Sequence, residues 1–479
     1  MTRHHHRRIG RRALLATTAI AMGAVLAPVA AQAAPAARQT PVADGTAQSP
    51  TRTQDPVVRA LDRIAHPLRS TEPGGKSADL RALGAMIGGA EVVGLGEATH
   101  GSHEFFTMKE RLFRHLVREK GFRAFSLEFS WPAGLKINDY LQTGDGDARQ
   151  IAKETLANSP WDREEFVHLI EWMREHNRRN PTDTVHFVGN DLGGPAITDE
   201  FFGRITDYVH RHHPALAPRI DALYAGLRPL DDVFDYLNRP LAERQRLADQ
   251  AQRALDLIGA AGGRDQDRDR DRDRDRDRNR EAHDWAVQNA RSVAETTRFL
   301  TVNVNDSATL PDFQRFRDRV MARNILWWQK RTGHKMLVSA HNDHLGLIAG
   351  TAAMYPKTQG SFLRDALGRK YLPIGMTFDR GSFLSKDTAI GGEWRKFTVG
   401  NAAPGTNEHT LDRVRHRDFY VDLRAAAPAA RSWLDTARPT RSIGTMFGDD
   451  YPLQDLALGR SFDVLIHLHD VREAVPRTP

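Results

Sequence analysis

Ionisable side chains follow four short apolar stretches of this sequence, each near the point where the stretch ends. These side chains are Glu97 and His100, Glu128, Asp191, and His341 with His344. Imidazoles and carboxylates move protons near neutral pH, and a carboxylate beside a histidine fixes the histidine's tautomer. The same groups also bind divalent metals that activate water. Residue types and spacing therefore predict hydrolytic chemistry and leave two routes open, a histidine base or a bound metal.

Several other kinds of active site find no support in the sequence. It contains no G-x-S-x-G elbow for a serine nucleophile and no Walker loop. Gly94-x-Gly96 lacks the third glycine of a dinucleotide site, and Thr107 stands where H-E-x-x-H would need its second histidine. Cysteine is absent, which excludes a thiol nucleophile, a cysteine-based metal site and disulfides.

The apolar stretches that precede these side chains are typical of buried strands. We predict strands at residues 91–95, 122–129, 184–188, 335–340, 371–378 and 461–469. Between the first two, apolar residues recur at helical spacing, and Gly121 is placed to end that helix. The alternation predicts an α/β fold with a mostly parallel central sheet flanked by helices. Because ligands bind outside the carboxyl ends of parallel strands, we expect the candidate side chains to converge on one cleft.

Strand signals are missing from about residue 198 to 301, where leucine, alanine and arginine recur at helical spacing. This segment predicts a helical insertion or cap within an α/β domain of residues 56–479. Inside it, residues 264–280 are almost pure Arg-Asp alternation without an apolar face. We expect this run to be disordered, as a solvated loop expansion rather than a partner-binding tail.

Residues 1–33 have the composition of a secretory signal peptide. Two arginine pairs precede an uncharged, alanine-rich stretch at residues 13–31, and an A-x-A cleavage site follows. Arg11 and Arg12 also resemble a twin-arginine signal. A membrane anchor is the alternative, but the apolar part is short and rich in alanine and glycine. Residues 34–55 are predicted to be a disordered linker. We expect a secreted, extracellular protein without stable membrane association once the signal is removed.

The basic net charge belongs mostly to this leader. The formal charge of +7 falls to about +2 without it, because the leader carries five arginines and no acid. No focused basic patch with interleaved aromatic residues is evident, so we expect no nucleic-acid partner.

The segment Gly96-Glu97-Ala98-Thr99-His100-Gly101 resembles the signature block of the erythromycin esterase family. Further stretches resemble the family's pattern, namely Glu104-Phe105-Phe106, Lys109, Arg111-Leu112, Glu128, Trp131, Gly189-Asn190-Asp191, Arg317-Asp318, Ala340-His341-Asn342-Asp343-His344, Tyr371 and Gly375. Together they span about residues 90–380. We therefore expect the fold of that family.

The resemblance implies hydrolysis of a carboxylic ester, typified by the opening of a macrolide lactone, with no required metal or other cofactor. It implies that His100 is the general base for water, with Glu97 and Glu128 as catalytic residues beside it. The expected substrate-binding residues are His341, His344, Lys109 and Asp191. The expected partner is thus a small-molecule ester, with a macrolide as one candidate.

Two alternatives stay open at this point. A metal-dependent hydrolase could use the same histidines, since spacing does not separate the two routes. A non-catalytic exported ligand-binding protein could also keep this fold, because cap loops and helices shape the pocket and a fold does not fix a function.

Overall fold

The structure is a computed structural model that describes residues 55–194, 196–265, 273–303, 306–388, 392–448 and 450–478. The predicted signal peptide (residues 1–33) and the predicted linker (34–55), except for Asp55, lie outside the described residues. No helix in the described part is long and apolar enough to cross a membrane.

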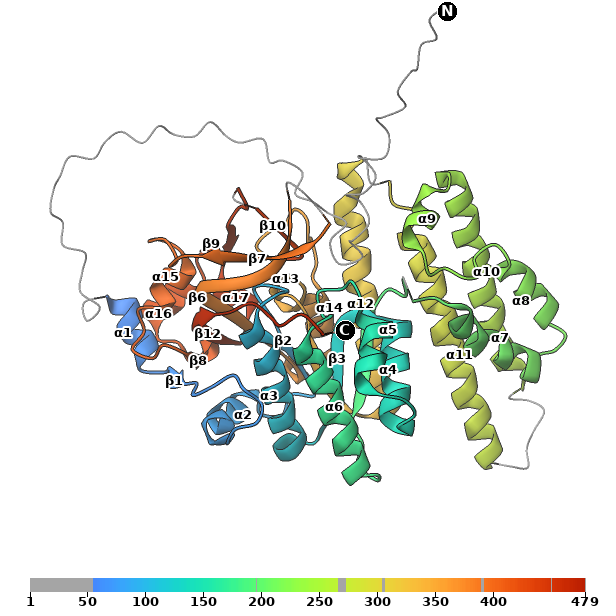
Figure 1. Cartoon of the computed structure of the whole chain (residues 1–479), viewed down its shortest axis with the longest axis horizontal. Helices are drawn as coiled ribbons and strands as arrows, with labels where there is room; N and C mark the ends of the chain where they lie inside the picture. The colour runs from blue at the N-terminus through green and yellow to red at the C-terminus, as the bar shows by residue number, and fades with distance from the viewer. Residues whose placement is uncertain are drawn as a thin grey trace, which may run out of the picture.

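A ten-stranded sheet forms the centre of the molecule, with the strand order β1-β8-β12-β6-β2-β5-β3-β4 and with β7 and β10 paired to β6 (Figure 1). The strands are β1 (His66–Pro67), β2 (Val92–Leu95), β3 (Phe122–Ser130), β4 (His186–Asp191), β5 (Lys335–Ser339), β6 (Tyr371–Asp387), β7 (Trp394–Val399), β8 (Phe419–Asp422), β10 (Met446–Phe447) and β12 (Val464–Val471). All neighbours from β12 through β4 are parallel, whereas β1, β8 and β7 pair antiparallel. The predicted α/β class with a mostly parallel sheet is confirmed. A separate small sheet joins β9 (Arg438–Thr440) to β11 (Gln454–Leu456).

The six predicted strands correspond to β2 to β6 and β12. The largest difference is in β6, which continues to Asp387 instead of ending at Phe378. Its second half keeps strand geometry because β7 and β10 pair with it there. We predicted neither β7, which follows β6 directly, nor β10, which comes from a distant segment, so only the first half of β6 was predicted.

Helices cover both faces of the sheet. The main helices outside the insertion are α1 (Pro56–Asp62), α2 (Arg81–Ile87), α3 (His103–Lys120), α4 (Trp131–Thr143), α5 (Ala148–Leu156), α6 (Glu164–Arg179), α12 (Leu310–Thr332), α13 (Asn342–Leu345), α14 (Gln359–Leu367), α15 (Asn407–Leu411), α16 (Pro428–Leu434) and α17 (Leu458–Ser461). Short 3-10 turns are η1 (Ala78–Leu80), η2 (Ser307–Thr309), η3 (Gly368–Lys370) and η4 (Leu423–Ala425). Helix α3 is the one predicted from spacing, and Gly121 ends it with φ 71°.

Alternating side chains of the central strands belong to two different cores. Val93 of β2 packs in a cluster with residues of α2, α3 and α6, such as Leu112 and Ile170. Val92, its neighbour, packs in a second cluster with residues of α12 and α14, such as Ile325 and Leu363. Successive residues of a strand point to opposite faces, so the near-continuous apolar run of β2 reflects burial on both sides.

The segment expected to be a helical insertion contains α7 (Asp199–His212), α8 (Ala217–Tyr224), α9 (Val233–Asn238), α10 (Leu241–Asp265) and α11 (Asp273–Phe299). In Figure 1 these helices stand together at one side of the sheet, beyond α4 and α12. The structure differs from the predicted disorder for residues 264–265 and 273–280, which it assigns to α10 and α11. Extending a helix costs little once its packed part is formed. Residues 266–272 of that run lie outside the described part.

Gly134 of α4 brings that helix against β4, and its replacement tests this close packing. A Cβ at Gly134 would lie 2.1 Å from the backbone nitrogen of Gly189. We expect Gly134→Ala to lower the free energy of unfolding by about 1–3 kcal/mol, measured by urea denaturation. Gly203 of α7 is the matched control, because a Cβ there would meet nothing within 4 Å. Gly203→Ala is expected to stabilise by about 0.5–1 kcal/mol. Equal effects at the two positions would contradict the packing described.

Candidate active site

The side chains singled out from the sequence meet at one edge of the sheet. Glu97 and His100 lie in the loop between β2 and α3, and Glu128 lies near the end of β3. Asp191 ends β4, and His341 caps the start of α13 directly after β5. The strands β2, β5, β3 and β4 are consecutive parallel neighbours, so their carboxyl ends share this edge.

His100, Glu97 and Lys109 form a buried relay. The Nδ1 atom of His100 lies 2.6 Å from Oε1 of Glu97, and Nζ of Lys109 donates to Oε2 of the same carboxylate. With its Nδ1–H donated to Glu97, the imidazole presents the lone pair of Nε2 as a base. Burial alone would raise the pKa of Glu97, but the Lys109 ammonium and His100 outweigh burial and lower it. Glu97 therefore stays ionised and can hold an imidazolium at position 100.

His341 presents the opposite tautomer to the same space. Its Nδ1 lies 3.3 Å from the backbone nitrogen of Asp343 and 3.5 Å from Oδ2 of the same residue. When Nδ1 accepts the backbone N–H, the ring proton is on Nε2. That Nε2 is buried and has no hydrogen-bond partner among the described residues. The rings of His100 and His341 lie 5.0 Å apart between centroids. A histidine that can accept a proton thus lies beside a histidine that can donate a hydrogen bond.

Arg317 of α12 joins the two carboxylates at the ends of β3 and β4. Its Nη2 donates to Oε1 of Glu128 at 2.8 Å and to Oδ2 of Asp191 at 2.5 Å, while its Nε donates to Asp191 Oδ2 at 2.9 Å. The second oxygen of Glu128 accepts the backbone N–H of His341 at 3.0 Å. Glu128 therefore holds the loop after β5 in place through its backbone.

His344 lies between two carboxylates and acts as a cation. Its Nε2 is 3.2 Å from Glu128 Oε1, and its Nδ1 is 2.9 Å from Asp318 Oδ1. Burial opposes the charge, but these two carboxylates raise the pKa of His344 to about 10. His344, and with it Arg317, hold the pKa of Glu128 well below its ordinary value despite burial. At neutral pH His344 is already protonated, so it cannot serve as the base.

The residues that organise this centre include three for which no role was predicted from the sequence. Arg317 and Asp318 matched the family's pattern, but no role was predicted for them, and they lie within α12. Ser442 donates to Oδ2 of Asp343 at 2.6 Å and so fixes the turn that positions His341. Nothing in the sequence around Ser442 could have indicated this contact, which joins segments about a hundred residues apart.

A cleft of about 990 Å³ opens beside this centre. Glu128, Asp191 and Arg317 line its inner end. Its other walls come from α4, the segment before α6, α7, the start of α9, and the start of β7, with the aromatic side chains Phe129, Trp161, Phe201, Phe234 and Trp394. His100 and His341 do not line the cleft. Trp161 does, and it lies edge-on to His100 with 5.8 Å between ring centroids, at the border between the cleft and the histidine pair.

The donor set of this centre does not favour a metal ion. A guanidinium occupies the position between Glu128 and Asp191, and both nitrogens of His344 face carboxylates. Among the described residues, the group of histidine and acidic side chains with ligand atoms close enough for a metal consists of Asp379, Asp412 and His469. None of these belongs to the candidate active site.

Lys109 can be tested through the pH dependence of turnover. In Lys109→Met, Glu97 loses its cation, and burial then raises its pKa. We expect the acidic limb of the kcat/KM profile to move to higher pH, because a protonated Glu97 no longer accepts the Nδ1–H of His100 and cannot stabilise its imidazolium. Lys109→Arg keeps the charge and is expected to leave the limb near its original pH. An unmoved limb in Lys109→Met would contradict the relay.

Comparison with known protein families gives a match over most of the chain. The family model described as erythromycin esterase matches residues 117–471. The matched part begins within α3, after the loop that carries Glu97 and His100. The chain is 23% identical over 385 residues to erythromycin esterase type II of Escherichia coli, covering 75% of this chain and 86% of that protein. It is 22% identical over 438 residues to the putative hydrolase YbfO of Bacillus subtilis strain 168, covering 87% and 91%.

Solved structures share the fold. A succinoglycan biosynthesis protein has a TM-score of 0.76 at 29% identity, covering 89% of this chain and 100% of that chain. A Bacillus cereus protein has a TM-score of 0.77 at 28% identity, covering 88% and 98%. A variant of the erythromycin esterase EreC in its open conformation has a TM-score of 0.65 at 16% identity, covering 85% and 98%.

Proposed function

This chain belongs to the erythromycin esterase family, and from that premise we propose that it hydrolyses a carboxylic ester with water activated by His100, without a metal. The complementary histidine pair carries the proposal. His100 offers a lone pair at Nε2, because Glu97 accepts its Nδ1–H at 2.6 Å. His341 offers a hydrogen-bond donor at a buried Nε2 that lacks a partner among the described residues.

The pair supports a direct attack of water on the ester. His100 takes a proton from water as the oxygen bonds to the carbonyl carbon, and Glu97 stabilises the resulting imidazolium. His341 Nε2–H donates to the oxygen that becomes negative, as an oxyanion hole does. When the tetrahedral intermediate collapses, the carbon–oxygen bond to the alcohol breaks, and His100 returns its proton to the leaving alkoxide. The products are a carboxylic acid and an alcohol.

The metal-dependent alternative has less support from the arrangement of charges. A metal cation would stabilise negative charge in this centre. The guanidinium of Arg317 and the imidazolium of His344 already supply positive charge for that purpose. Glu128, Asp191 and His344 are engaged with one another and with Arg317, so among the histidine donors of the alternative only the Nε2 atoms of His100 and His341 would be left for a metal.

The substrate that we propose is a bulky, partly apolar ester. A cleft of about 990 Å³ accommodates a drug-sized molecule. Its aromatic walls suit an apolar ring, and acids such as Glu154 and Glu200 suit a cationic or hydroxyl substituent. A macrolide lactone is the candidate that the names of the relatives suggest.

Mass spectrometry tests this function. Purified protein is treated with a chelator, checked for residual metal by elemental analysis, and incubated with macrolides and a panel of simple esters. We expect at least one compound to gain one water without added metal. Turnover that returns only with a stoichiometric metal would favour the metallohydrolase, and tight capture without turnover across the panel would favour a ligand-binding protein.

We further propose that the protein is secreted, on the basis of the signal-like composition of residues 1–33. Cell fractionation with N-terminal sequencing of the exported protein tests this. We expect a new N-terminus near residue 34, and a full-length protein retained inside the cell would overturn the proposal.

A further inference from the structure

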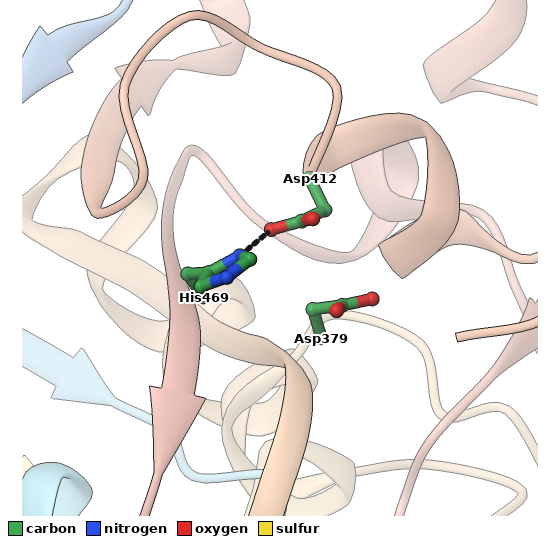
Figure 2. Close-up of side chains that lie close together, drawn as sticks. All are labelled: Asp379, Asp412 and His469. Atoms are coloured by element: carbon green, nitrogen blue, oxygen red, sulfur yellow. Dashed lines mark hydrogen bonds and ion pairs between the residues drawn. The ribbon is translucent and has the colours of Figure 1, made fainter. Parts of the chain in front are cut away.

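A second group of ionisable side chains lies outside the candidate active site, where β6 and β12 run side by side. Asp379 of β6 and His469 of β12 are lateral neighbours, because the residues on either side of them pair in the parallel register of the two strands. Asp412, which directly follows α15, faces both of them (Figure 2). One ligand atom from each of the three lies within 4.8 Å of the others.

His467 adds an unsatisfied nitrogen to this group. Its side chain is fully buried, and Nδ1 lies 3.0 Å from Oγ1 of Thr377. Its Nε2 has no hydrogen-bond partner among the described residues, and Oδ1 of Asp412 lies 3.6 Å away from it. When Nδ1–H donates to Thr377, Nε2 carries a lone pair directed toward Asp412. Asp412 Oδ1, at 3.6 Å, is within ion-pair distance of this buried nitrogen but too far for a hydrogen bond, so the nitrogen is poorly satisfied and points to a ligand between the two side chains.

We propose that Asp379, Asp412, His467 and His469 bind a structural zinc ion. Two imidazole nitrogens and two carboxylate oxygens are ligands that Zn²⁺ accepts in a tetrahedral site. Zinc bonds of about 2.0–2.2 Å place tetrahedral ligands roughly 3.3–3.5 Å apart. The 3.6 Å between His467 Nε2 and Asp412 Oδ1 fits this spacing, and the 2.5 Å between His469 Nδ1 and Asp412 Oδ1 widens by about 1 Å as the shared proton leaves to solvent.

The surroundings suit a zinc ion that enters from solvent and then stays. Asp412 and His469 are 18% and 17% exposed at their side chains. Asp379 is held by the backbone N–H of Ala402 at 2.9 Å and by Asn401 at 2.8 Å, which leaves a further lone pair on each of its oxygens. The ion would tie the segment after α15 to β6 and β12. The chain has no cysteine, so no disulfide can do so.

Zinc titration of the full-length protein after chelation tests the site. We expect the parent to bind one more zinc per chain than Asp412→Asn, counted by elemental analysis after gel filtration. The zinc content is compared as a difference between the two proteins, because the imidazoles of His4, His5 and His6 are present in both and can also bind zinc. The zinc affinity of this site should fall at least about 100-fold in the variant, since loss of even an outer-shell partner costs about 10–100-fold. Added zinc should raise the Tm of the parent and not of the variant.

His469→Asn is a second variant expected to lose the same zinc. Asp221→Asn is the control, because His210 and Asp221 form an exposed histidine–aspartate pair that should not contribute to zinc binding. Equal zinc content in the parent and both variants, or a parent Tm that zinc leaves unchanged, would overturn the proposal. Ester hydrolysis by the chelated parent reports separately on His100, so failure of the zinc site leaves the proposed function standing.

Discussion

His100→Asn is expected to lower kcat/KM for a hydrolysed ester by about 10²–10⁴-fold, the range that a positioned general base contributes. Asparagine can still donate a hydrogen bond to Glu97, so the buried carboxylate keeps a partner. It offers no nitrogen lone pair to take a proton from water. The measurement is steady-state hydrolysis of whichever ester the panel identifies, with Tm recorded to show that the variant folds.

His210→Asn is the matched control for this substitution. His210 is a half-exposed residue of α7 that pairs with Asp221, and it neither lines the cleft nor contacts the histidine pair. We expect its kcat/KM to match that of the parent. A folded His100→Asn that hydrolyses the ester at the parental rate would remove the basis for a histidine-activated water.

Arg317→Met is expected to lower the free energy of unfolding by about 3–5 kcal/mol. The substitution leaves Glu128 and Asp191 facing each other in the interior without the guanidinium that now joins them. Burial already raises the pKa of Asp191 above its ordinary value, against the effect of Arg317. Without Arg317, one of the two carboxyls must take up a proton or the site must open. Urea denaturation at neutral pH measures the loss.

A surface ion pair serves as the control for the stability loss expected in Arg317→Met. Arg228 pairs with Asp199 at 2.7 Å at the surface, with side chains 37% and 67% exposed, so Arg228→Met is expected to cost less than about 1 kcal/mol. Arg317→Lys keeps a charge but loses the fork that spans two carboxylates, so its stability should lie between those of Arg317→Met and the parent. An Arg317→Met protein as stable as Arg228→Met would show that the two carboxylates are not held as described.

The sequence alone predicted the parts of this protein that depend on local patterns. The apolar runs before Glu97 and His341 identified β2 and β5, and helical spacing followed by Gly121 identified α3. Because strands separated by helices make parallel sheets, the polar residues at their ends could be expected at one edge. The family resemblance placed both Glu97 and Glu128 beside His100, and the structure shows that Glu97 is the one in contact with its ring.

Contacts between residues far apart in the sequence could not be predicted from local patterns. Arg317 matched the family's pattern without an assigned role, and only the tertiary fold brings it to Glu128 and Asp191. The base and donor roles of His100 and His341 depend on which ring nitrogen is engaged, which is a matter of geometry. The extension of β6 beyond Phe378 and the group around Asp412 likewise depend on strands that meet only in the folded chain.

A crystal structure of His100→Asn with an intact ester bound in the cleft would test the central claim most directly. The variant should bind the ester without cleaving it. We predict that Nε2 of His341 lies within hydrogen-bond reach of the ester carbonyl oxygen, and that a water beside residue 100 lies roughly 3–3.5 Å from the carbonyl carbon. An ester whose carbonyl lies at the far end of the cleft, out of reach of both histidines, would contradict the account.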